Sequence, residues 1–239
     1  MSVAIVTGGS RGLGRALAEG LIRAGWSVII DGRDPDAVQK AETELRALLP
    51  DPSQEVFGIS GDITDAQHRA DLVMTAQDAG GLDLLVNNAG TLGASPLPML
   101  ADYPLEELRV AFEVNVVAPL GMIQDSLPML ENSARPRIID ITSDAGVEAY
   151  EGWGGYGAGK AALDHLSAVL ATEQPAVTVW AVDPGDLRTD MHQAAFPGED
   201  ISDRPEPATV VAAFLDLIES DRPSGRYRAT ELLTAGASA

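Results

Sequence analysis

The chain has 239 residues, 36 acidic and 16 basic side chains, and a formal net charge of −20. This charge argues against a function in nucleic-acid binding, because contacts with phosphates need clustered positive side chains. There is no cysteine, which excludes disulfides, thiolate catalysis and cysteine-bound zinc, and the three histidines lack metal-ligand spacing. No apolar run approaches the roughly 20 residues of a membrane span. A strand-like run begins almost at Met1 and leaves no room for a signal peptide, so we expect a cytoplasmic protein without a metal or a membrane partner.

Short apolar runs with strand character alternate with helical patterns along the whole chain. The predicted strands are residues 3–7, 27–31, 55–59, 82–86, 137–142, 177–182 and 226–230, and the predicted helices are residues 13–23, 35–49, 66–78, 104–130, 156–172 and 208–219. Continuous apolar strands separated by helices are typical of a parallel sheet that is covered on both faces.

The length fits one domain, and no linker rich in Gly, Ser or Pro divides it. We therefore predict one α/β domain over residues 1–239: a Rossmann-type, doubly wound parallel sheet in three α/β/α layers. Ligands of such sheets bind at the carboxyl ends of the strands. An irregular segment rich in Pro and Gly predicts a substrate lid around residues 187–207.

A glycine-rich turn, residues 7–14 (TGGSRGLG), connects the first predicted strand to the first helix. Glycines at 8, 12 and 14 permit a tight turn and let the backbone approach a pyrophosphate at the helix N-terminus. The spacing is GxxxGxG and not the usual GxGxxG. The turn predicts a dinucleotide site, and the alternative is a glycine-rich turn without a ligand.

The stretch from Tyr156 to Lys160 (YGAGK) places a phenol and an ammonium four residues apart, on one face of a predicted helix. The ordinary pKa of tyrosine is ~10, which is too high for proton exchange at neutral pH. A positive charge about 4 Å away, at an effective dielectric of roughly 20, favours the phenolate by about 4 kcal/mol. That energy corresponds to roughly three pKa units, so the spacing predicts a general acid/base near pH 7. The alternative is a chance occurrence, because this spacing is common, and the other motifs of the chain decide between the two.

Several motifs in this order resemble the classical short-chain dehydrogenase/reductase family, over the chain from the first strand to about Met191. Residues 7–14 match its cofactor turn, residues 87–90 (NNAG) match the motif that steadies the central sheet, and Asp62 matches an aspartate placed against the adenine. Pro184 and Gly185 match the turn after the sixth strand. The resemblance implies a catalytic tetrad of Asn115, Ser143, Tyr156 and Lys160. The cofactor-binding residues that it implies are Gly8, Ser10, Arg11, Gly12, Leu13, Gly14, Arg33, Asp62, Ile63, Asn88, Ala89, Gly90, Tyr156, Lys160, Pro184, Gly185 and Thr189.

The resemblance also implies a mechanism, in which hydride transfer interconverts a carbonyl and an alcohol. Ser143 would hydrogen-bond the substrate oxygen, and Tyr156 would donate the proton during reduction. Lys160 would lower the pKa of Tyr156 and hold the ribose hydroxyls.

A proline supports the assignment of Asn115. Pro119 has no N–H, so it cannot bond to the carbonyl of the residue four positions earlier in a helix. The carbonyl of Asn115 is then left free, and the resemblance implies a water there that links Lys160 to solvent. A simple proline kink is the alternative.

The end of the second strand favours NADP over NAD, although NAD remains possible. Gly32 stands where cofactors without a 2′-phosphate usually meet a carboxylate, and Arg33 follows it. We expect Arg11 and Arg33 to converge on the phosphate, unless both are ordinary surface arginines. Strand alternation should turn Asp31 away from this pocket.

The substrate itself is harder to predict. The predicted contacts are Ser143, Tyr150, Trp153, Tyr156 and Met191. Of these, Trp153 and Met191, together with Leu187 and Phe196, suggest an apolar pocket for a small hydrophobic ketone or aldehyde. Surface packing is the alternative role for Tyr150, Trp153, Met191 and Phe196. Residues 161–172 are apolar on more than one face, which predicts a second subunit and hence a homodimer or homotetramer.

Two other functions remain open. One is a non-catalytic nucleotide-sensing protein on the same fold, since fold alone does not define function. The other is an epimerase or dehydratase, which would consume no NADPH with carbonyl substrates.

Overall fold

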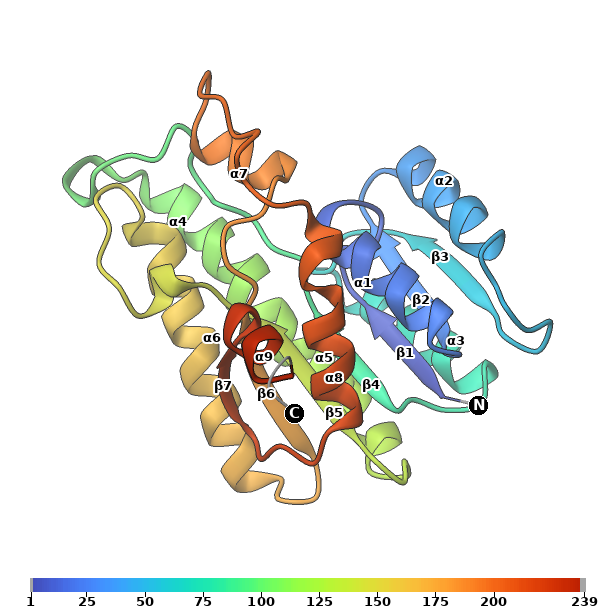
Figure 1. The fold of residues 1–239 in the computed structure, drawn as a ribbon. Helices are drawn as coiled ribbons and strands as arrows, with labels where there is room; N and C mark the ends of the chain where they lie inside the picture. The colour runs from blue at the N-terminus through green and yellow to red at the C-terminus, as the bar shows by residue number, and fades with distance from the viewer. Residues whose placement is uncertain (1, 237–239) are drawn as a thin grey trace.

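The structure is a computed structural model that describes residues 2–236, so Met1 and residues 237–239 of the predicted domain lie outside the described residues. Seven parallel strands of the described chain form one sheet in the order β3-β2-β1-β4-β5-β6-β7 (Figure 1). The strands are β1 (Val3–Val6), β2 (Ser27–Gly32), β3 (Val56–Ser60), β4 (Leu84–Asn87), β5 (Arg137–Ile141), β6 (Thr178–Asp183) and β7 (Gly225–Arg228). All seven predicted strands are present, with boundaries that differ by up to two residues.

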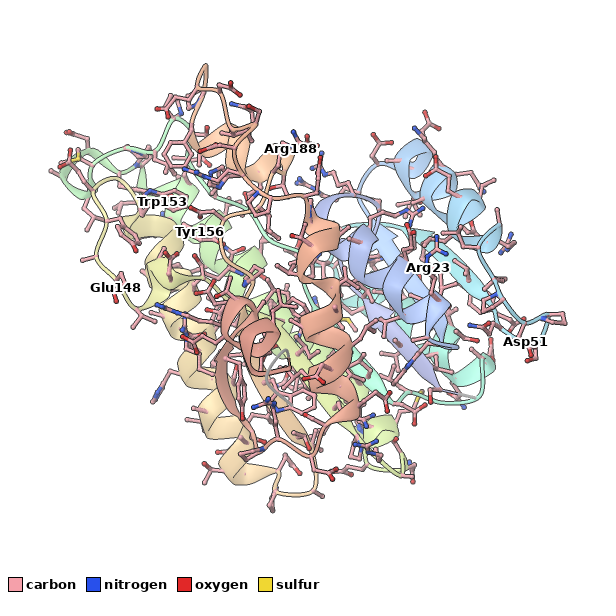
Figure 2. All side chains as sticks on the ribbon, in the orientation of Figure 1. Arg23, Asp51, Glu148, Trp153, Tyr156 and Arg188 are labelled. Atoms are coloured by element: carbon pink, nitrogen blue, oxygen red, sulfur yellow. The ribbon has the colours of Figure 1, made fainter. Side chains whose placement is uncertain are left out.

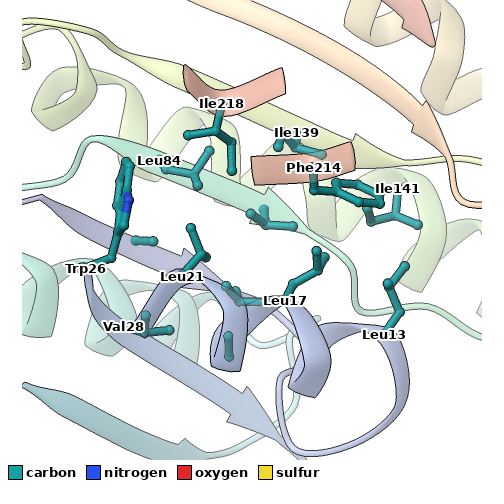
Figure 3. Packing of buried hydrophobic residues seen from close by; sticks show 14 of the residues in the cluster. Leu13, Leu17, Leu21, Trp26, Val28, Leu84, Ile139, Ile141, Phe214 and Ile218 are labelled. Atoms are coloured by element: carbon teal, nitrogen blue, oxygen red, sulfur yellow. The ribbon is translucent and has the colours of Figure 1, made fainter. Parts of the chain in front are cut away.

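Helices cover both faces of the sheet. They are α1 (Gly12–Arg23), α2 (Pro35–Arg46), α3 (Ala66–Asp78), α4 (Leu105–Phe112), α5 (Ala118–Leu130), α6 (Gly154–Glu173), α7 (Asp190–Ala195), α8 (Val211–Glu219) and α9 (Ala229–Gly236). One core packs α1, α2, α8 and α9 against the sheet (Figure 3), and a second core packs α3, α5 and α6 against the opposite face.

Strand alternation explains the two cores. Ala4 and Val6 of β1 belong to the first core, and Val3 and Ile5 belong to the second. Successive side chains of a strand point to opposite faces, so a strand buried on both faces is apolar at every position. The three-layer, doubly wound architecture predicted from the sequence is confirmed.

The long helix predicted over residues 104–130 is interrupted. Helix α4 ends at Phe112, a π-helical segment covers Glu113–Val117, and α5 begins at Ala118. In the π-helical segment the N–H of Ala118 donates to the carbonyl of Glu113, five residues earlier. Pro119 lies next to the segment and has no N–H for the regular pattern, which explains why the interruption occurs there.

The sequence prediction missed two short helices. Helix α7 lies inside the predicted lid, where the side chain of Thr189 accepts a hydrogen bond from the N–H of His192 and caps it. Helix α9 starts directly after Arg228, so the last strand ends two residues earlier than expected.

The strand order reverses between β1 and β4, and ligands of open α/β sheets bind at the carboxyl ends of the strands on either side of such a point. No helix within residues 2–236 is long and apolar enough to cross a membrane.

Candidate active site

The turn between β1 and α1 has the geometry of a phosphate cradle. Gly8 and Gly12 have φ values of 65° and 56°, which favour glycine. A Cβ at Gly14 would lie 2.4 Å from Asn88 Nδ2 and 2.5 Å from the carbonyl oxygen of Gly8. The side chain of Arg11, which precedes α1, caps none of the N–H groups in the first turn. These groups are therefore oriented for a pyrophosphate, so the turn fits a dinucleotide.

The NNAG motif after β4 holds this turn in place. The side chain of Asn88 donates to the carbonyls of Thr7 (2.8 Å) and Gly8 (3.2 Å). The Thr7 hydroxyl accepts from the backbone N–H groups of Asn88 and Ala89. Asn87 donates to Asp140 of β5 at 2.8 Å, so the motif also links neighbouring strands.

At the end of β2, this chain has Gly32 where a cofactor site selective for NAD usually has a carboxylate. A Cβ at Gly32 would lie 2.7 Å from Ser10 Oγ, so the serine occupies the space that an acidic side chain would need. The pKa of Asp62 is lowered mainly by the backbone hydrogen bond from Thr64, and the positive charge of the exposed Arg33 lowers it further.

The predicted convergence of Arg11 and Arg33 on a 2′-phosphate stays a prediction. Arg11 Nη1 lies 3.5 Å from Asp190 Oδ2 at the start of α7, and both side chains are mostly exposed. An exposed ion pair is held weakly, because solvent screens it and the long side chain keeps its freedom.

Asp31 contacts the backbone of the glycine turn, and its predicted orientation away from the 2′-phosphate stays a prediction. It is buried, its Oδ1 accepts from the N–H of Gly8 at 2.5 Å, and its Oδ2 lies 3.0 Å from His68 Nε2. The contact with His68 was not predicted. Its signal in the sequence is a carboxylate within an apolar strand, which needs a buried partner.

Tyr156 and Lys160 lie on α6 and are both buried (Figure 2 shows Tyr156). The amine of Lys160 lies 5.6 Å from the centroid of the Tyr156 ring, which confirms the predicted shared face. The amine donates to the carbonyl of Ile141 at 2.7 Å, and the Ser143 side chain lies near the Tyr156 hydroxyl, whose pKa it helps to lower. The structure therefore brings Ser143, Tyr156 and Lys160 together after β5.

The predicted lowering of the Tyr156 pKa is wrong for this structure. Burial raises the pKa of Tyr156, the negative charges of Asp183 and Asp144 raise it further, and the hydrogen bond with Ser143 opposes them. Burial also lowers the pKa of Lys160 to about 8, although Asp140 and Asp164 oppose that change. The sequence estimate omitted the loss of hydration and the nearby carboxylates, and these outweigh the effect of the ammonium.

Asn115 lies in the π-helical segment, with its side chain fully buried. Its Nδ2 donates to the carbonyl of Thr91 (2.7 Å) and its Oδ1 accepts from the N–H of Thr91 (2.9 Å). A Cβ at Gly159 would lie 3.5 Å from Asn115 Cβ, so Asn115 packs against α6 next to Lys160. The predicted water at its carbonyl stays a prediction.

The loop after β6 closes toward the glycine turn. Gly185 has a φ of 76° after Pro184. The Thr189 side chain would lie 3.6 Å from a Cβ at Gly12, and Met191 Cε would lie 3.8 Å from a Cβ at Gly90. These contacts bring the predicted lid over the cofactor turn and the NNAG motif.

Aromatic rings form one wall beside Tyr156. Trp153 meets the Tyr156 ring edge to face at 5.7 Å, and Phe196 of the lid lies 5.9 Å from Trp153 (Figure 2 shows Trp153 and Tyr156 close together). Leu187 is not part of this wall, because it is buried in the first core. Its prediction as a pocket residue is therefore wrong.

Beyond this wall, a cavity of about 370 Å³ opens at the carboxyl ends of β6 and β7. Its lining is polar and includes Asp144, Glu148, Tyr150, Asp183, Asp186 and Arg228. The Tyr150 hydroxyl donates to Asp144 Oδ2 at 3.0 Å, so Tyr150 lies on the polar side of the site. The contribution of β7 was not predicted.

A family model described as short chain dehydrogenase matches residues 2–200. The chain belongs to this family. Its members are NAD(P)-dependent oxidoreductases, which agrees with a dinucleotide cradle beside Ser143 and the buried pair Tyr156 and Lys160.

Two curated relatives of this short-chain dehydrogenase are reductases. A sepiapterin reductase from Mus musculus is 34% identical over 202 residues, which cover 81% of this chain and 77% of the relative. A rhamnolipids biosynthesis 3-oxoacyl-[acyl-carrier-protein] reductase from Pseudomonas aeruginosa is 37% identical over 177 residues, which cover 72% of this chain and 66% of the relative.

Solved structures share the fold over nearly the whole chain. A short chain dehydrogenase from Pseudomonas syringae matches with a TM-score of 0.88 and 27% identity, over 95% of this chain and 94% of that one. A short chain dehydrogenase from Shigella flexneri, complexed with NADP, matches with a TM-score of 0.87 and 27% identity, over 96% of this chain and 97% of that one.

Proposed function

We propose that this short-chain dehydrogenase is an NADP-dependent oxidoreductase that interconverts a carbonyl and an alcohol on a small substrate, with Tyr156 as the general acid/base. One observation carries the proposal: α6 buries both Tyr156 and Lys160, with the lysine amine 5.6 Å from the centroid of the tyrosine ring. A nucleotide-sensing protein has no need for this arrangement. Bound nicotinamide supplies or accepts the hydride.

Tyr156 is protonated at neutral pH, as the proton donor in carbonyl reduction must be. Because burial raises its pKa, the phenol stays protonated at neutral pH, which is the form that a general acid needs. Ser143 is placed to hydrogen-bond the carbonyl oxygen, although its hydroxyl donates to Asp144 Oδ1 at 3.0 Å in this structure. The names of both curated relatives, which are reductases, agree with this direction.

The residues around the glycine turn would hold the cofactor. The first-turn N–H groups of α1 would bind the pyrophosphate, Asp62 would face the adenine, and Lys160 would hold the ribose hydroxyls. Ser10 and Arg33 flank the position of a 2′-phosphate, and Gly32 has no side chain to supply the carboxylate that NAD-selective sites use. The neighbouring structure complexed with NADP supports the same choice.

The substrate would lie between the aromatic wall and the polar cavity. Trp153 and Phe196 suit an apolar group, and Met191 would contact it from the lid. Tyr150 and Asp144 limit the apolar surface on the other side. This division supports a small substrate, hydrophobic at one end.

A homodimer or homotetramer remains part of the proposal. On α6, Ala161, Ala168 and Val169 are exposed, together with His165 between them, while seven of the 20 residues of the helix are buried. A second copy of the chain would cover these exposed apolar side chains. Light scattering at micromolar concentration measures the mass directly, and a monomer would contradict this part. A cytoplasmic location stays a prediction from the sequence.

The function is tested with a panel of aldehydes, ketones and alcohols and both cofactors, followed by nicotinamide absorbance. Tyr156→Phe removes the acidic hydroxyl and should reduce kcat by about 10²- to 10⁴-fold, while NADP binding stays measurable. Retention of most of the rate would rule out the assigned acid/base. Turnover without any net use of NADPH would instead favour an epimerase or dehydratase, and no turnover with intact NADP binding would favour a sensor.

A further inference from the structure

Asp31 is a buried carboxylate near the end of β2, and only 2% of it is exposed. Ile29, two residues earlier, belongs to the core between the sheet and α3. Side chains two residues apart on a strand share a face, so Asp31 lies on the face that α3 covers. A carboxylate is costly to bury unless it is paired and hydrogen-bonded, so the partners of Asp31 indicate why it is there.

The two oxygens of Asp31 connect the glycine turn to α3. Oδ1 accepts from the N–H of Gly8 at 2.5 Å, and Oδ2 lies 3.0 Å from Nε2 of His68. His68 belongs to the first turn of α3 and is 6% exposed. An ionised carboxylate can only accept hydrogen bonds, so Nε2 of His68 carries a proton and donates to Asp31. The carboxylate that holds Gly8 is therefore itself oriented by α3.

Gly61 fixes the position of His68. A Cβ at Gly61 would overlap Nδ1 and Cγ of the His68 ring, so only a glycine leaves room for the imidazole. The N–H of Gly61 donates to the carbonyl of Gly32 at 3.0 Å, which connects this residue to the end of β2. The imidazole is therefore enclosed between Gly61 and the carboxylate that it orients.

Gly8 is held at both of its backbone polar groups. Its N–H donates to Asp31, and its carbonyl accepts from the side chain of Asn88 at 3.2 Å. Its φ is 65°, and glycine has more backbone freedom than any other residue. Two side chains that hold such a residue in place remove this freedom before a ligand binds, and the ordering then costs nothing on binding. The turn is preorganised at Gly8.

Stability alone does not require the pair of Asp31 and His68. Replacement of a buried ion pair by apolar residues of similar volume is often neutral or stabilising. We propose that Asp31 and His68 are positioning residues for the cofactor: His68 orients the carboxylate of Asp31, and Asp31 holds Gly8 in the conformation that receives the pyrophosphate. This inference rests on the proposed function, which places a dinucleotide at residues 7–14.

Single substitutions should weaken the binding of both cofactors equally, because NADPH and NADH share the pyrophosphate. His68→Leu leaves the carboxylate unpaired near an anionic cofactor and free to turn away from Gly8. The dissociation constants of NADPH and NADH should rise by about 10-fold, as for the loss of one charge-assisted hydrogen bond. Asp31→Leu also frees Gly8 but removes a negative charge, so both constants should rise less, by several-fold. In both variants kcat at saturating cofactor should stay unchanged.

Two further variants separate positioning from stability. His68→Gln retains an N–H donor for Asp31 and should restore most of the affinity. The double variant Asp31→Leu/His68→Leu buries only apolar side chains, so its unfolding temperature should recover. Its affinity for NADPH should nevertheless equal that of Asp31→Leu, because His68 acts only through the carboxylate. If the pair served stability alone, affinity and unfolding temperature would recover together.

Gln54 supplies a matched control near the start of β2. It is 4% exposed, and its Nε2 donates to the carbonyls of Ile22 (3.0 Å) and Trp26 (2.9 Å). Gln54→Leu removes these buried hydrogen bonds and should lower the unfolding temperature, while the affinity for NADPH stays that of the natural chain. Thermal unfolding shows which variants are folded, and fluorescence titration with NADPH and NADH measures the affinities without any substrate. If a single leucine variant does not fold, the double variant and His68→Gln carry the test.

The outcomes separate this inference from the proposed function. If the natural chain binds NADPH but Asp31→Leu or the double variant binds it as tightly or more tightly, the inference is overturned and the proposed function stands. The same conclusion follows if affinity falls only in step with unfolding temperature, in Gln54→Leu as in the others. If the natural chain binds neither NADPH nor NADH, both are overturned. Equal weakening for the two cofactors, with rescue by His68→Gln and an unchanged affinity in Gln54→Leu, supports the inference.

Discussion

The cofactor side and the catalytic side of the crevice are built from different kinds of interaction. On the cofactor side, the site is built mainly from backbone groups. Gly8 and Gly12 turn the chain, the lack of a side chain at Gly14 lets Asn88 approach, and the first-turn N–H groups of α1 are available to bind phosphate. On the catalytic side, Lys160 and Asp183 are charged groups that are only 4% exposed, so they are less hydrated than charged groups on the surface. A backbone cradle depends on local sequence, whereas the balance among buried charges depends on the whole fold.

The largest effect should come from filling the cradle. Gly14→Ala would place a Cβ 2.5 Å from the carbonyl oxygen of Gly8, which is backbone and cannot turn aside. The turn must then shift, and we expect kcat/KM for the cofactor to fall by about 100-fold, as for a displacement near 1 Å. Gly159→Ala is the control, because its nearest contact is an ordinary 3.5 Å. Equal cofactor affinity in the two variants, measured by fluorescence titration, would show that the cradle is not closely fitted.

The second prediction concerns the buried amine of Lys160, whose pKa is lowered to about 8 from 10.5. Between these two values the unfolded chain binds more protons than the folded chain, so the free energy of unfolding increases with pH. Lys160→Met has no such group. The stability of the natural chain relative to this variant should therefore increase by about 3 kcal/mol between pH 7 and pH 10.5.

Urea unfolding of both chains across this pH range makes the measurement. The difference between them cancels the titrating groups that do not interact with Lys160, so its slope reports Lys160 together with its neighbours Asp140 and Asp164. If the free energies of unfolding of the two chains change in parallel with pH, the amine of Lys160 is better hydrated than its burial indicates.

The same contrast explains what could be predicted from the sequence. The strands and the positions of Gly8, Gly12 and Gly14 follow from apolar alternation and from local turn requirements, and they were predicted almost to the residue. The proline at 119 correctly marked a disturbed helix, although its π-helical form needed the structure.

The errors arose where distant residues meet. The pKa of Tyr156 depends on burial and on Asp183, which lies 27 positions along the chain. Leu187 looked like a pocket residue but turns into the core that α1 and α8 form. His68 and Asp31 pair across 37 positions. Spacing along the chain carries no signal for such contacts, because tertiary packing decides them.

The third prediction tests cofactor choice. Arg33 is exposed beside Ser10 and Asp62, where a 2′-phosphate would lie. Arg33→Ala should weaken the affinity for NADP by roughly 10-fold or more, because a charge-assisted hydrogen bond to the phosphate is lost. The affinity for NAD should stay nearly unchanged. Arg23→Ala is the control, since Arg23 pairs with Glu19 at the far end of α1 (Figure 2 labels Arg23). If Arg33→Ala lowers the affinities for NADP and NAD equally, Arg33 does not bind the 2′-phosphate.

The smallest expected effect separates two roles for Arg11. In this structure it pairs with Asp190 of the lid, and the two side chains are 71% and 81% exposed, so the pair is weak enough to exchange for a phosphate. If Arg11 binds NADP, Arg11→Ala should weaken the affinity for NADP by several-fold. Asp190→Ala should leave the affinity for NADP equal or slightly tighter, because it releases the arginine. NAD affinity should stay constant in both. Equal weakening by the two variants would instead show that the lid contact itself stabilises the bound state, and the cofactor side would then depend on a surface charge pair as well as on its backbone.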